Sequence, residues 1–590
     1  MLIGYILGLL FENFFFLSGS CVYALVILSV VGACIPFIFK KSYNQLSPYT
    51  LVLQEFLLLG FFFTLGVLSY FLSLKSHDFS YPIKPKEKIT FSLQHELKSN
   101  EKYRKYEVKI HNLSRNTLAI FSHQKKLRPL DFQHYYTGTF NVYKLKEKPS
   151  PYSFDYKKYL ERKGIHFLIY SDSDLSKTKK NPIGIGDRIK EKRRKILIKI
   201  DRAPILSSKN KELIKAIVLA DKSRISPDIT SDFTHAGLAH ILTISGAHMA
   251  VIFWMTFSLL SLIFSYKYRK IVILISLTLI WCFCVFIGYG NPIVRSCIMI
   301  TVYYLYVLTQ RTPNLLHSLS LSAFIILIFD PFQIFDLGFQ LSFSAVLGIY
   351  WLYSPIVKAL PENKSKLLEY FTKILALTLS AQIATLPLIL YYFHQFYILS
   401  VLANLVIVPL TEIVIISSLF MVFIVSSGIK IPLLFSLYNI SSEVFLSLVH
   451  FFSSFPSFIL RNIPLDISEF FVLCTIIFSL RFLILQFSLK NILISALFLF
   501  LFFSLRLALN FHAYNTREVL SYNLGGKHIL SVKEKNTAIF FVPKNTDKDH
   551  LTKYIITPYI THSRVKNYQI VDILRNNNII RYKGKNYTVY

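Results

Sequence analysis

Cysteine is scarce in this sequence. Six occur among 590 residues, and all six fall in apolar runs, at Cys21, Cys34, Cys282, Cys284, Cys297 and Cys474. Cysteines in such surroundings behave as small buried hydrophobic residues more often than as disulfide partners or metal ligands. We therefore expect neither a disulfide framework nor a cysteine-based metal site.

Acidic residues are also few. The chain has 33 Asp and Glu against 65 Lys and Arg, a formal net charge of +32 at pH 7. Membrane helices cannot carry that many cations, so most must lie outside the bilayer. Residues 75–202 alone hold about 31 Lys and Arg against about 14 Asp and Glu. Such a surplus suits a polyanion or an anionic membrane surface, and a solvated basic face is the plain alternative.

Long polar stretches are missing from most of the remaining chain. Hydrophobic residues make up 53% of it and the mean hydropathy is +0.46, which excludes one ordinary soluble fold. Roughly a dozen segments reach the ~20 apolar residues that cross a bilayer. The clearest are 51–74, 271–287, 398–425 and 470–487, and three of these tolerate one charge, at Glu55, Glu412 and Arg481. Residues 1–18 lack a basic n-region and a small-residue cleavage pattern, so we expect an uncleaved span.

The first three apolar segments, 1–18, 21–39 and 51–74, set the expected orientation. Lys40 and Lys41 follow the second segment, whereas the turn at 18–20 is uncharged. The positive-inside rule then places Lys40 in the cytoplasm. The third helix would exit outward, so the basic stretch that follows is expected outside the cytoplasm.

Short runs of alternating apolar residues recur in this basic stretch and predict strands. They lie at 89–93, 106–110, 118–121, 140–143 and 165–170. Five or so short strands fit a small barrel such as an OB-fold, whose face often binds single-stranded nucleic acid. Tyr and Phe interleaved with Lys and Arg are consistent with base stacking and equally consistent with a barrel core.

Two helical segments belong to the same stretch. Residues 153–163 predict a helix that Ser153 can cap and Gly164 can end, with Asp155 in its first turn. Residues 186–201, GDRIKEKRRKILIKID, form a basic run that ends in Ile and Leu. We expect this run to suit the membrane surface, with its cations near phospholipid headgroups.

Residues from about 233 to 510 return to membrane composition, with nine or ten expected spans. Loop cations do not fall on one side under a simple alternating count, so some segments are expected to be half-helices or interfacial. They are Lys267, Arg269, Lys270, Arg311, Lys364, Lys366 and Lys373. The last stretch, 511–590, alternates again at 528–532 and 537–542 and predicts a small β-rich tail.

Four places in the membrane region put Gly or Pro beside polar groups. The first, FTHAGLAHILTISGAHMA at 233–250, holds His235, His240 and His248 around a Ser245-Gly246 break. Backbone groups freed at such a break must find protein or water, which predicts a cavity or pathway. The histidines are five and eight residues apart with no Asp or Glu among them, so packing around a pore explains them better than zinc.

The second place is GYGNPIVRSCIMI at 288–300, where Arg295 lies near the start of an apolar run. An Arg in a membrane helix costs a few kcal/mol unless it faces water, finds a partner or snorkels. Arg295 therefore faces a phosphate path or reaches the interface.

The third and fourth places combine helix breakers with polar side chains at expected membrane depth. The third, DPFQIFDLGFQLSFSAVLGIY at 330–350, holds Asp330, Asp336, Gln340 and Ser342 beside Gly338. The fourth, at 381–416, carries Gln382, Pro387, Asn404, Pro409 and Glu412. Both predict discontinuous helices that enclose a polar route, with kinked, tightly packed helices as the alternative.

These strings carry a resemblance to a known family. HAGLAHILTISGAHMA looks like the hallmark segment of the ComEC competence family, and AIVLADKSRIS at 216–226 resembles the lead-in to it. SPYSFDYKKYLERKGIHF at 150–167 resembles the end of that family's extracytoplasmic OB-like domain. NPIVRSCIMI, DPFQIFDLGFQLSFSAVLGI and ANLVIVPLTEIVI are similar to its later membrane segments, in the same order.

The resemblance implies passage of single-stranded transforming DNA across the bacterial inner (cytoplasmic) membrane during natural competence. It implies a polytopic α-helical membrane protein with an inserted extracytoplasmic small β-barrel and a short β-rich tail. The expected parts are N-terminal transmembrane helices at 1–74, the basic OB-like domain at 75–205, the polytopic channel region at 206–510 and the tail at 511–590. The side chains matched to its recurrent segments as candidates for lining the DNA path are His240, Ser245, His248, Arg295, Gln340, Gln382, Asn404 and Glu412.

The sequence departs from many members of that family at its end. The H-x-H-x-D-H motif of a metallo-β-lactamase-like nuclease is absent, and the tail is too short for that fold. No G-x-x-x-x-G-K-[ST] string occurs either. We therefore expect no enzyme activity and no cofactor or metal. The expected partners are a separate DNA receptor and a cytoplasmic DNA-translocating motor, and a homodimer stays open.

Two other functions fit part of the pattern. A secondary transporter of a small solute would explain broken helices and intramembrane charges, but not an outer basic barrel. A membrane-embedded metal-dependent hydrolase built on the three histidines would need a carboxylate partner, for which only the remote Asp336 and Glu412 are available.

Overall fold

The structure is a computed structural model of the whole chain. It describes residues 1–39, 48–77, 86–100, 102–111, 117–171, 175–180, 182–223, 225–361, 365–429, 431–524, 527–544, 546–573, 579–582 and 585–588. Lys40, Lys41 and Lys364, on which part of the orientation argument rests, lie outside these residues.

Long apolar helices dominate the fold, and the chain is a multi-pass membrane protein. Ten of the described helices are long and apolar enough to cross a bilayer, and three shorter apolar helices accompany them, close to the dozen expected. The ten are α3 (Pro48–His77), α8 (Gly246–Ile263), α9 (Arg269–Ile287), α10 (Asn291–Leu308), α12 (Leu337–Ala359), α13 (Lys366–Phe393), α14 (Ser400–Ser427), α15 (Pro432–Ser453), α16 (Ile467–Leu485) and α17 (Leu489–Asn515). The shorter apolar stretches are α1 (Leu2–Phe15), residues Gly19–Cys34 of α2 (Gly19–Phe39) and α11 (Leu315–Phe329).

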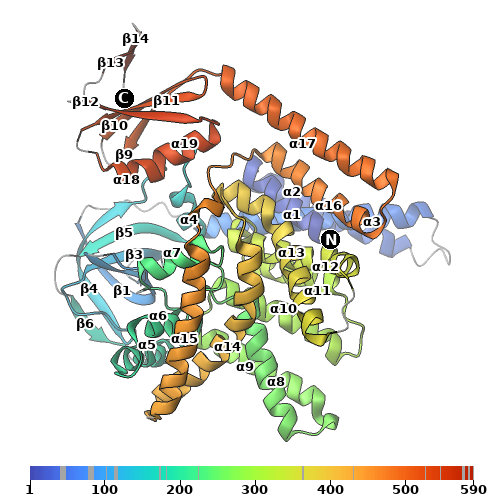
Figure 1. The fold of residues 1–590 in the computed structure, drawn as a ribbon, viewed down its shortest axis with the longest axis vertical. Helices are drawn as coiled ribbons and strands as arrows, with labels where there is room; N and C mark the ends of the chain where they lie inside the picture. Colours follow the sequence, from blue (N-terminus) through green and yellow to red (C-terminus); the bar gives the residue numbers. More distant parts are fainter. Residues whose placement is uncertain are drawn as a thin grey trace.

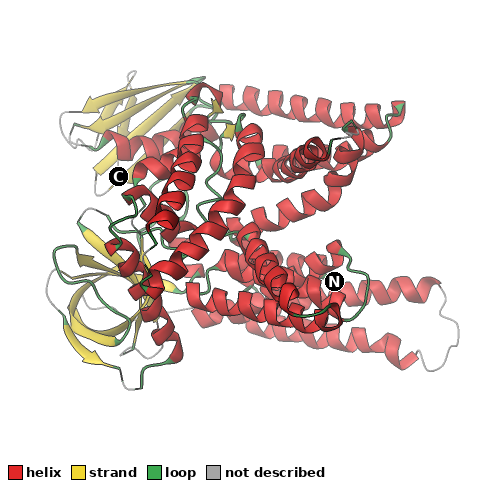
Figure 2. Ribbon diagram, turned by 60° about the horizontal axis from the view of Figure 1, so that its bottom comes forward, coloured by secondary structure: helices red, strands yellow, loops and turns green. Residues whose placement is uncertain are grey.

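The strand-rich parts lie together on one side of the molecule, and the helices extend away from them (Figures 1 and 2). The first is a closed barrel whose five strands follow the order β1-β2-β3-β5-β4 and return to β1. All its ladders are antiparallel except β3–β5. The strands are β1 (Lys86–Leu97), β2 (Tyr103–Ile110), β3 (Thr117–Gln124), β4 (His134–Lys144) and β5 (Ile165–Ser171), with β6 (Ser176–Lys179) added beside β4. The expected small barrel is confirmed.

The inward side chains explain why these runs alternate. Phe91, Phe121 and Phe140 are buried together with their rings 4.6 to 5.7 Å apart. Most aromatics of the strands' inner positions therefore form the core, and base stacking needs other rings.

Helix α4 (Tyr156–Arg162) is shorter than the predicted 153–163 and has a different cap. The Asp155 side chain accepts the backbone N–H of Lys158 at 2.9 Å. Ser153 instead donates its hydroxyl to the carbonyl of Ser150, in the turn before the helix. The predicted cap at Ser153 is wrong, because the Ser153 hydroxyl bonds within the turn that precedes the helix and Asp155 is the N-cap residue.

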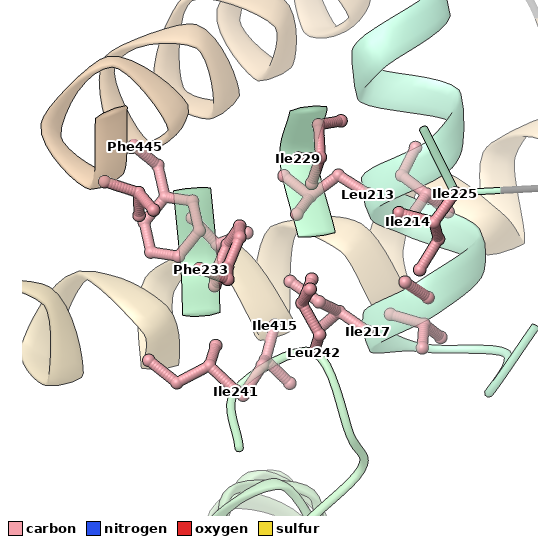
Figure 3. Packing of buried hydrophobic residues seen from close by; sticks show 14 of the residues in the cluster. Leu213, Ile214, Ile217, Ile225, Ile229, Phe233, Ile241, Leu242, Ile415 and Phe445 are labelled. Atoms are coloured by element: carbon pink, nitrogen blue, oxygen red, sulfur yellow. The ribbon is translucent and has the colours of Figure 1, made fainter. Parts of the chain in front are cut away.

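Helices α5 (Ile185–Arg202), α6 (Ser208–Ile217) and α7 (Pro227–His235) join the barrel to the membrane helices. Their apolar faces pack on α14 and α15 in one large core, where Ile214, Phe233, Ile415 and Phe445 are all buried (Figure 3). Helix α5 therefore lies against protein on one face, rather than only on a membrane surface.

The chain leaves helical geometry in all four predicted places, but in the fourth it does so at 394–399 and not at a proline. The chain leaves helical geometry between α7 and α8, between α9 and α10, and through a 3-10 turn at Pro331–Phe335 before α12. Pro387 and Pro409, in contrast, lie inside the continuous helices α13 and α14. A proline removes one N–H and can kink a membrane helix without ending it, because neighbouring groups satisfy the freed carbonyl.

The tail is a mixed α/β unit rather than only β-rich. Its sheet has the order β12-β11-β10-β9, and β11 and β12 run parallel. A parallel pair needs a crossover, which the helical turns at 548–562 supply. The strands are β9 (Glu518–Leu524), β10 (Lys527–Glu534), β11 (Thr537–Pro543) and β12 (Asn567–Ile573), with β13 (Ile579–Tyr582) and β14 (Lys585–Thr588) after them. Helix α17 extends to Asn515, so the tail begins later than residue 511.

Helices α1 and α3 pack unusually closely, and glycine makes this possible. A Cβ on Gly66 would lie 2.2 Å from the carbonyl oxygen of Tyr5, and one on Gly8 would lie 1.9 Å from that of Phe63. Small residues allow such backbone approach between membrane helices.

We expect Gly66→Ala to separate the two helices and to destabilise the protein by about 1–3 kcal/mol, the usual cost of overpacking. Thermal unfolding in detergent measures this as a lower midpoint. The matched control is Gly60→Ala on the same helix, because a Cβ there meets nothing within 4 Å. Equal midpoints for the two variants would contradict the close packing.

Candidate functional site

A cavity of about 1140 Å³ lies where the barrel meets the membrane helices. Its walls come from β1 and β2, α4, α5 and the turn at 220–223. Its floor comes from the helix connections around 287–293 and 329–338. Two of the four helix breaks thus meet at one place, next to the basic domain.

Positive charge predominates in this cavity. The acidic side chains on its wall are Glu96, Glu107, Asp155, Asp221, Asp330 and Asp336. The basic ones, which outnumber them, are Lys98, Lys158, Arg162, Lys163, Lys190, Arg193, Arg194, Lys222 and Arg295. A concave, low-dielectric surface with a surplus of one sign focuses the field and attracts an anion.

Arg295 lies at the floor and is only 3% exposed. Its Nη1 is 3.3 Å from Asp336 Oδ1 and 3.4 Å from Gln333 Oε1. Among the described residues its Nε has no hydrogen-bond partner. Gly338 makes room for the pair, because a Cβ there would lie 2.7 Å from Arg295 Nη2. The second and third sequence motifs therefore form one unit.

Helix α5 supplies a row of cavity side chains that sequence reasoning assigned to the membrane surface. Lys190, Arg193, Arg194 and Leu197 all line the cavity. Their spacing of three and four residues places them on one helical face, and this signal was present in the sequence. Arg193 donates to the carbonyl of Leu219 through Nε at 3.1 Å and Nη2 at 2.6 Å, which holds α5 against the segment before α7.

Burial sets the protonation of the cavity groups. It lowers the pKa of Lys222, and it is also the largest cause of the lowered pKa of Lys190 and Arg193. Burial, followed by the charges of Lys190 and Arg193, lowers the pKa of His95 to about 4. The imidazole is thus neutral near pH 7, and the buried cations lack full compensation, so a bound anion would stabilise their charged forms.

The structure groups several predicted path residues near the cavity floor. Gln340 lies on α12 after Gly338 and donates to the carbonyl of Ile334 at 2.9 Å. A Cβ on Gly246, which follows Ser245, would lie 3.6 Å from the hydroxyl of Ser296, the neighbour of Arg295. His248 Nδ1 lies 3.2 Å from the Ser245 backbone nitrogen and 3.0 Å from its hydroxyl, which caps the start of α8. His248 Nε2 is buried without a partner among the described residues.

The remaining path candidates are placed differently. Gln382 Oε1 accepts from the Ser400 hydroxyl at 3.4 Å, and Asn404 donates to the Ser400 carbonyl at 2.7 Å. These two therefore form a second polar group where α13 and α14 meet. His240 is exposed in the turn before α8, and Glu412 is exposed on α14, apart from the others.

No cluster of three or more His, Cys, Asp or Glu that could hold a metal occurs in the described part of the chain. Of the three histidines weighed as ligands, His248 caps α8 and His235 lies 3.4 Å from the Ser231 hydroxyl.

The helix connections fall into two alternating groups, contrary to the expected scatter of loop cations. Among the connections that join successive membrane helices from α8 to α17, those beside the cavity, or paired with them through β7 (Phe396–Tyr397) and β8 (Ile459–Leu460), hold one basic residue, Arg461. The connections at the opposite helix ends, with their flanks, hold Lys267, Arg269, Lys270, Arg311, Lys358, Lys364, Lys366, Lys430 and Lys490. The alternation becomes regular once the short α11 is counted as a crossing helix.

Residues 217–490 match the family model described as Competence protein. This match covers somewhat less than half of the chain and supports an assignment of that region to the competence protein family. The matched region contains the cavity floor and the Arg295–Asp336 pair, whereas the barrel and α5 precede it.

Two relatives share this competence region. "ComE operon protein 3" of Bacillus subtilis (strain 168) is 26% identical over 260 residues, which cover 44% of this chain and 32% of the relative. An "Uncharacterized protein" of Aquifex aeolicus (strain VF5) is 27% identical over 257 residues, which cover 43% and 57%. The match thus spans about a third of the first relative's length and somewhat more than half of the second's. No solved structure matches the chain.

The neutral state of His95 predicts a pH dependence of stability. Its folded pKa of about 4 is below the unfolded value of about 6.5, so the unfolded chain binds a proton first as the pH falls. We expect the unfolding midpoint of the native protein to drop between pH 6.5 and pH 4. The midpoint of His95→Gln should drop less steeply over the same range. The control is His317→Gln, since His317 is exposed at the start of α11. A slope for His95→Gln equal to that of the native protein would refute the assignment.

Proposed function

We propose that this protein carries single-stranded DNA across the bacterial cytoplasmic membrane during competence, and that the cavity is where the strand enters the helices. The match of residues 217–490 to the competence protein family and the likeness to ComE operon protein 3 support a role in DNA uptake. The observation that carries the proposal is the cation-lined cavity between the basic barrel and the broken membrane helices.

The physical requirement comes from the charge of the strand. Each nucleotide carries one phosphate, and a bare charge in hydrocarbon is prohibitive, so the path must supply cations or water. The cavity offers nine Lys and Arg side chains, several of them poorly compensated. Phosphates that bind there would replace solvent counterions, and the affinity would fall steeply with salt.

Beyond the cavity, we propose a route along the polar side chains that interrupt the helices. Arg295 would be the innermost cation, and Gln340, Ser245 and His248 would lie next to it. His240, Gln382, Asn404 and Glu412 are the remaining candidates of this route. The chain has no nucleotide-binding loop, so a cytoplasmic motor would pull the strand and a separate receptor would deliver it.

We further propose that the barrel and the tail face outward from the cytoplasm. For the membrane helices α8 to α17, nine basic residues lie in or beside the connections at the helix ends away from the cavity, against one, Arg461, in the connections on the cavity side. Positive-inside orientation would place the basic connections in the cytoplasm. Lys40 and Lys41, between α2 and α3 in sequence, agree with the same orientation.

Single cysteines in a background without the six native ones test this orientation. A membrane-impermeant maleimide should label Lys157→Cys in the barrel and Lys548→Cys in the tail of intact cells. Lys267→Cys and Arg311→Cys should react only after permeabilisation. Labelling of Lys267→Cys in intact cells, with Lys157→Cys protected, would reverse the proposed topology.

Arg295 is the test of the entry site. Arg295→Ala leaves the carboxylate of Asp336 without its partner and removes the innermost cation, so we expect transfer of labelled DNA into the cytoplasm to fall at least about tenfold, the effect of about 1.4 kcal/mol. Arg295→Lys keeps the charge and should retain part of the transfer.

The matched control is Arg481→Ala at an equal level in the membrane. Arg481 is also a membrane arginine, but it packs over the Trp351 ring and away from the cavity. Native transfer by Arg295→Ala would overturn the entry site. Normal DNA transfer in a deletion strain that has lost uptake of a small solute would favour the transporter alternative.

A further inference from the structure

Three aromatic rings lie on or just before helix α4, at the edge of the cavity. The side chains of Phe154 and Tyr156 are 68% and 53% exposed, whereas Tyr159 is half-buried. Phe154 and Tyr159 are part of the cavity lining. We call Phe154, Tyr156 and Tyr159 the α4 ledge. Exposure of a Phe and a Tyr side by side, outside the barrel core, calls for an explanation.

The ledge is held in a defined geometry. Leu160 of α4 is buried against the outside of the barrel with Ile120, Leu145 and Ile165, and Tyr159 packs against this cluster. The rings of Tyr156 and Tyr159 are nearly parallel, with an interplanar angle of 25° and 6.1 Å between centroids. The ring of Phe154 lies 5.6 Å from that of Tyr159. Tyr159 thus anchors the ledge, and the side chains of Phe154 and Tyr156 remain exposed.

Cations surround the ledge. Lys163 Nζ lies 4.3 Å above the Tyr159 ring and 2.5 Å from its hydroxyl. Lys158 and Arg162, on the same short helix, line the cavity with it. Flat apolar rings next to cations match the two halves of a nucleotide, because the base stacks and the phosphate pairs with the cation.

We infer that the α4 ledge is a base-stacking site that receives one or two nucleotides of a single strand as it enters the cavity. This inference rests on the proposed function. It differs from binding on the strands of the barrel, whose inward aromatic rings are buried in the core. A membrane-interface anchor would also use exposed aromatics. The position of Phe154 and Tyr159 on the wall of a charged cavity, rather than on an outer rim, favours a nucleotide.

The test uses the full-length protein in lipid nanodiscs and two fluorescent probes of equal length and charge. One is an oligothymidylate, and the other is an abasic phosphodiester without bases. Stacking predicts that the protein binds the oligothymidylate at least about fivefold more tightly than the abasic probe. This ratio corresponds to the low end of the stacking energy of one base on an aromatic ring. Phe154→Ala/Tyr156→Ala should lose this preference and still bind the abasic probe as the native protein does.

Tyr266→Ala is the matched control, because Tyr266 is 80% exposed at the turn before α9 and should leave both affinities unchanged. Equal binding of both probes by the native protein would overturn the ledge and leave phosphate capture intact. Binding of neither probe at low salt would overturn capture as well. A double variant that keeps the base preference but inserts poorly into vesicles would identify the ledge as a membrane anchor instead.

Discussion

The ion pair of Arg295 with Asp336 is the interaction around which the cavity floor is built. A guanidinium that is only 3% exposed at this depth needs a partner, since an unpaired buried charge costs several kcal/mol. The same Asp336 oxygen accepts the N–H of Phe339 at 3.0 Å and so also starts α12. A Cβ on Gly338 would lie 2.7 Å from Arg295 Nη2 and 3.0 Å from Asp336 Oδ1, so a larger residue there would displace one of the two side chains. The Asp336 carboxylate thereby caps the start of α12, directly after the helix break, and pairs with the Arg295 guanidinium.

A second buried carboxylate ties the tail to the membrane helices. Glu469 on α16 is fully buried, with Arg506 of α17 at 3.3 Å and Arg564 of the tail at 2.5 Å. The tail also contacts the segment before α4, where Glu518 accepts the Tyr152 hydroxyl at 3.0 Å. The tail is therefore tied both to the membrane helices and to the polypeptide that precedes α4.

The buried cations of the cavity link stability to binding. Burial lowers the pKa of Lys190, Arg193 and Lys222, so each charged side chain is held at some cost to the folded state. Such costs are common at sites that bind charged ligands, because the ligand restores the missing compensation. The basic barrel and α5 are held together by hydrogen bonds such as the one from Lys190 to Gln94 at 2.9 Å.

The local patterns of the sequence determined the membrane helices, the barrel strands and the places of the helix breaks, because hydropathy and period-two alternation are properties of neighbouring residues. They failed at Ser153, whose hydroxyl bonds in the turn before α4. They also failed at Pro387 and Pro409, because surrounding groups let each helix continue through its proline. Only the tertiary structure shows that Arg295 pairs with Asp336 and that the cations of α5 line a cavity rather than a membrane surface. Those contacts join residues far apart in the chain, and their energies depend on burial that the sequence does not encode locally.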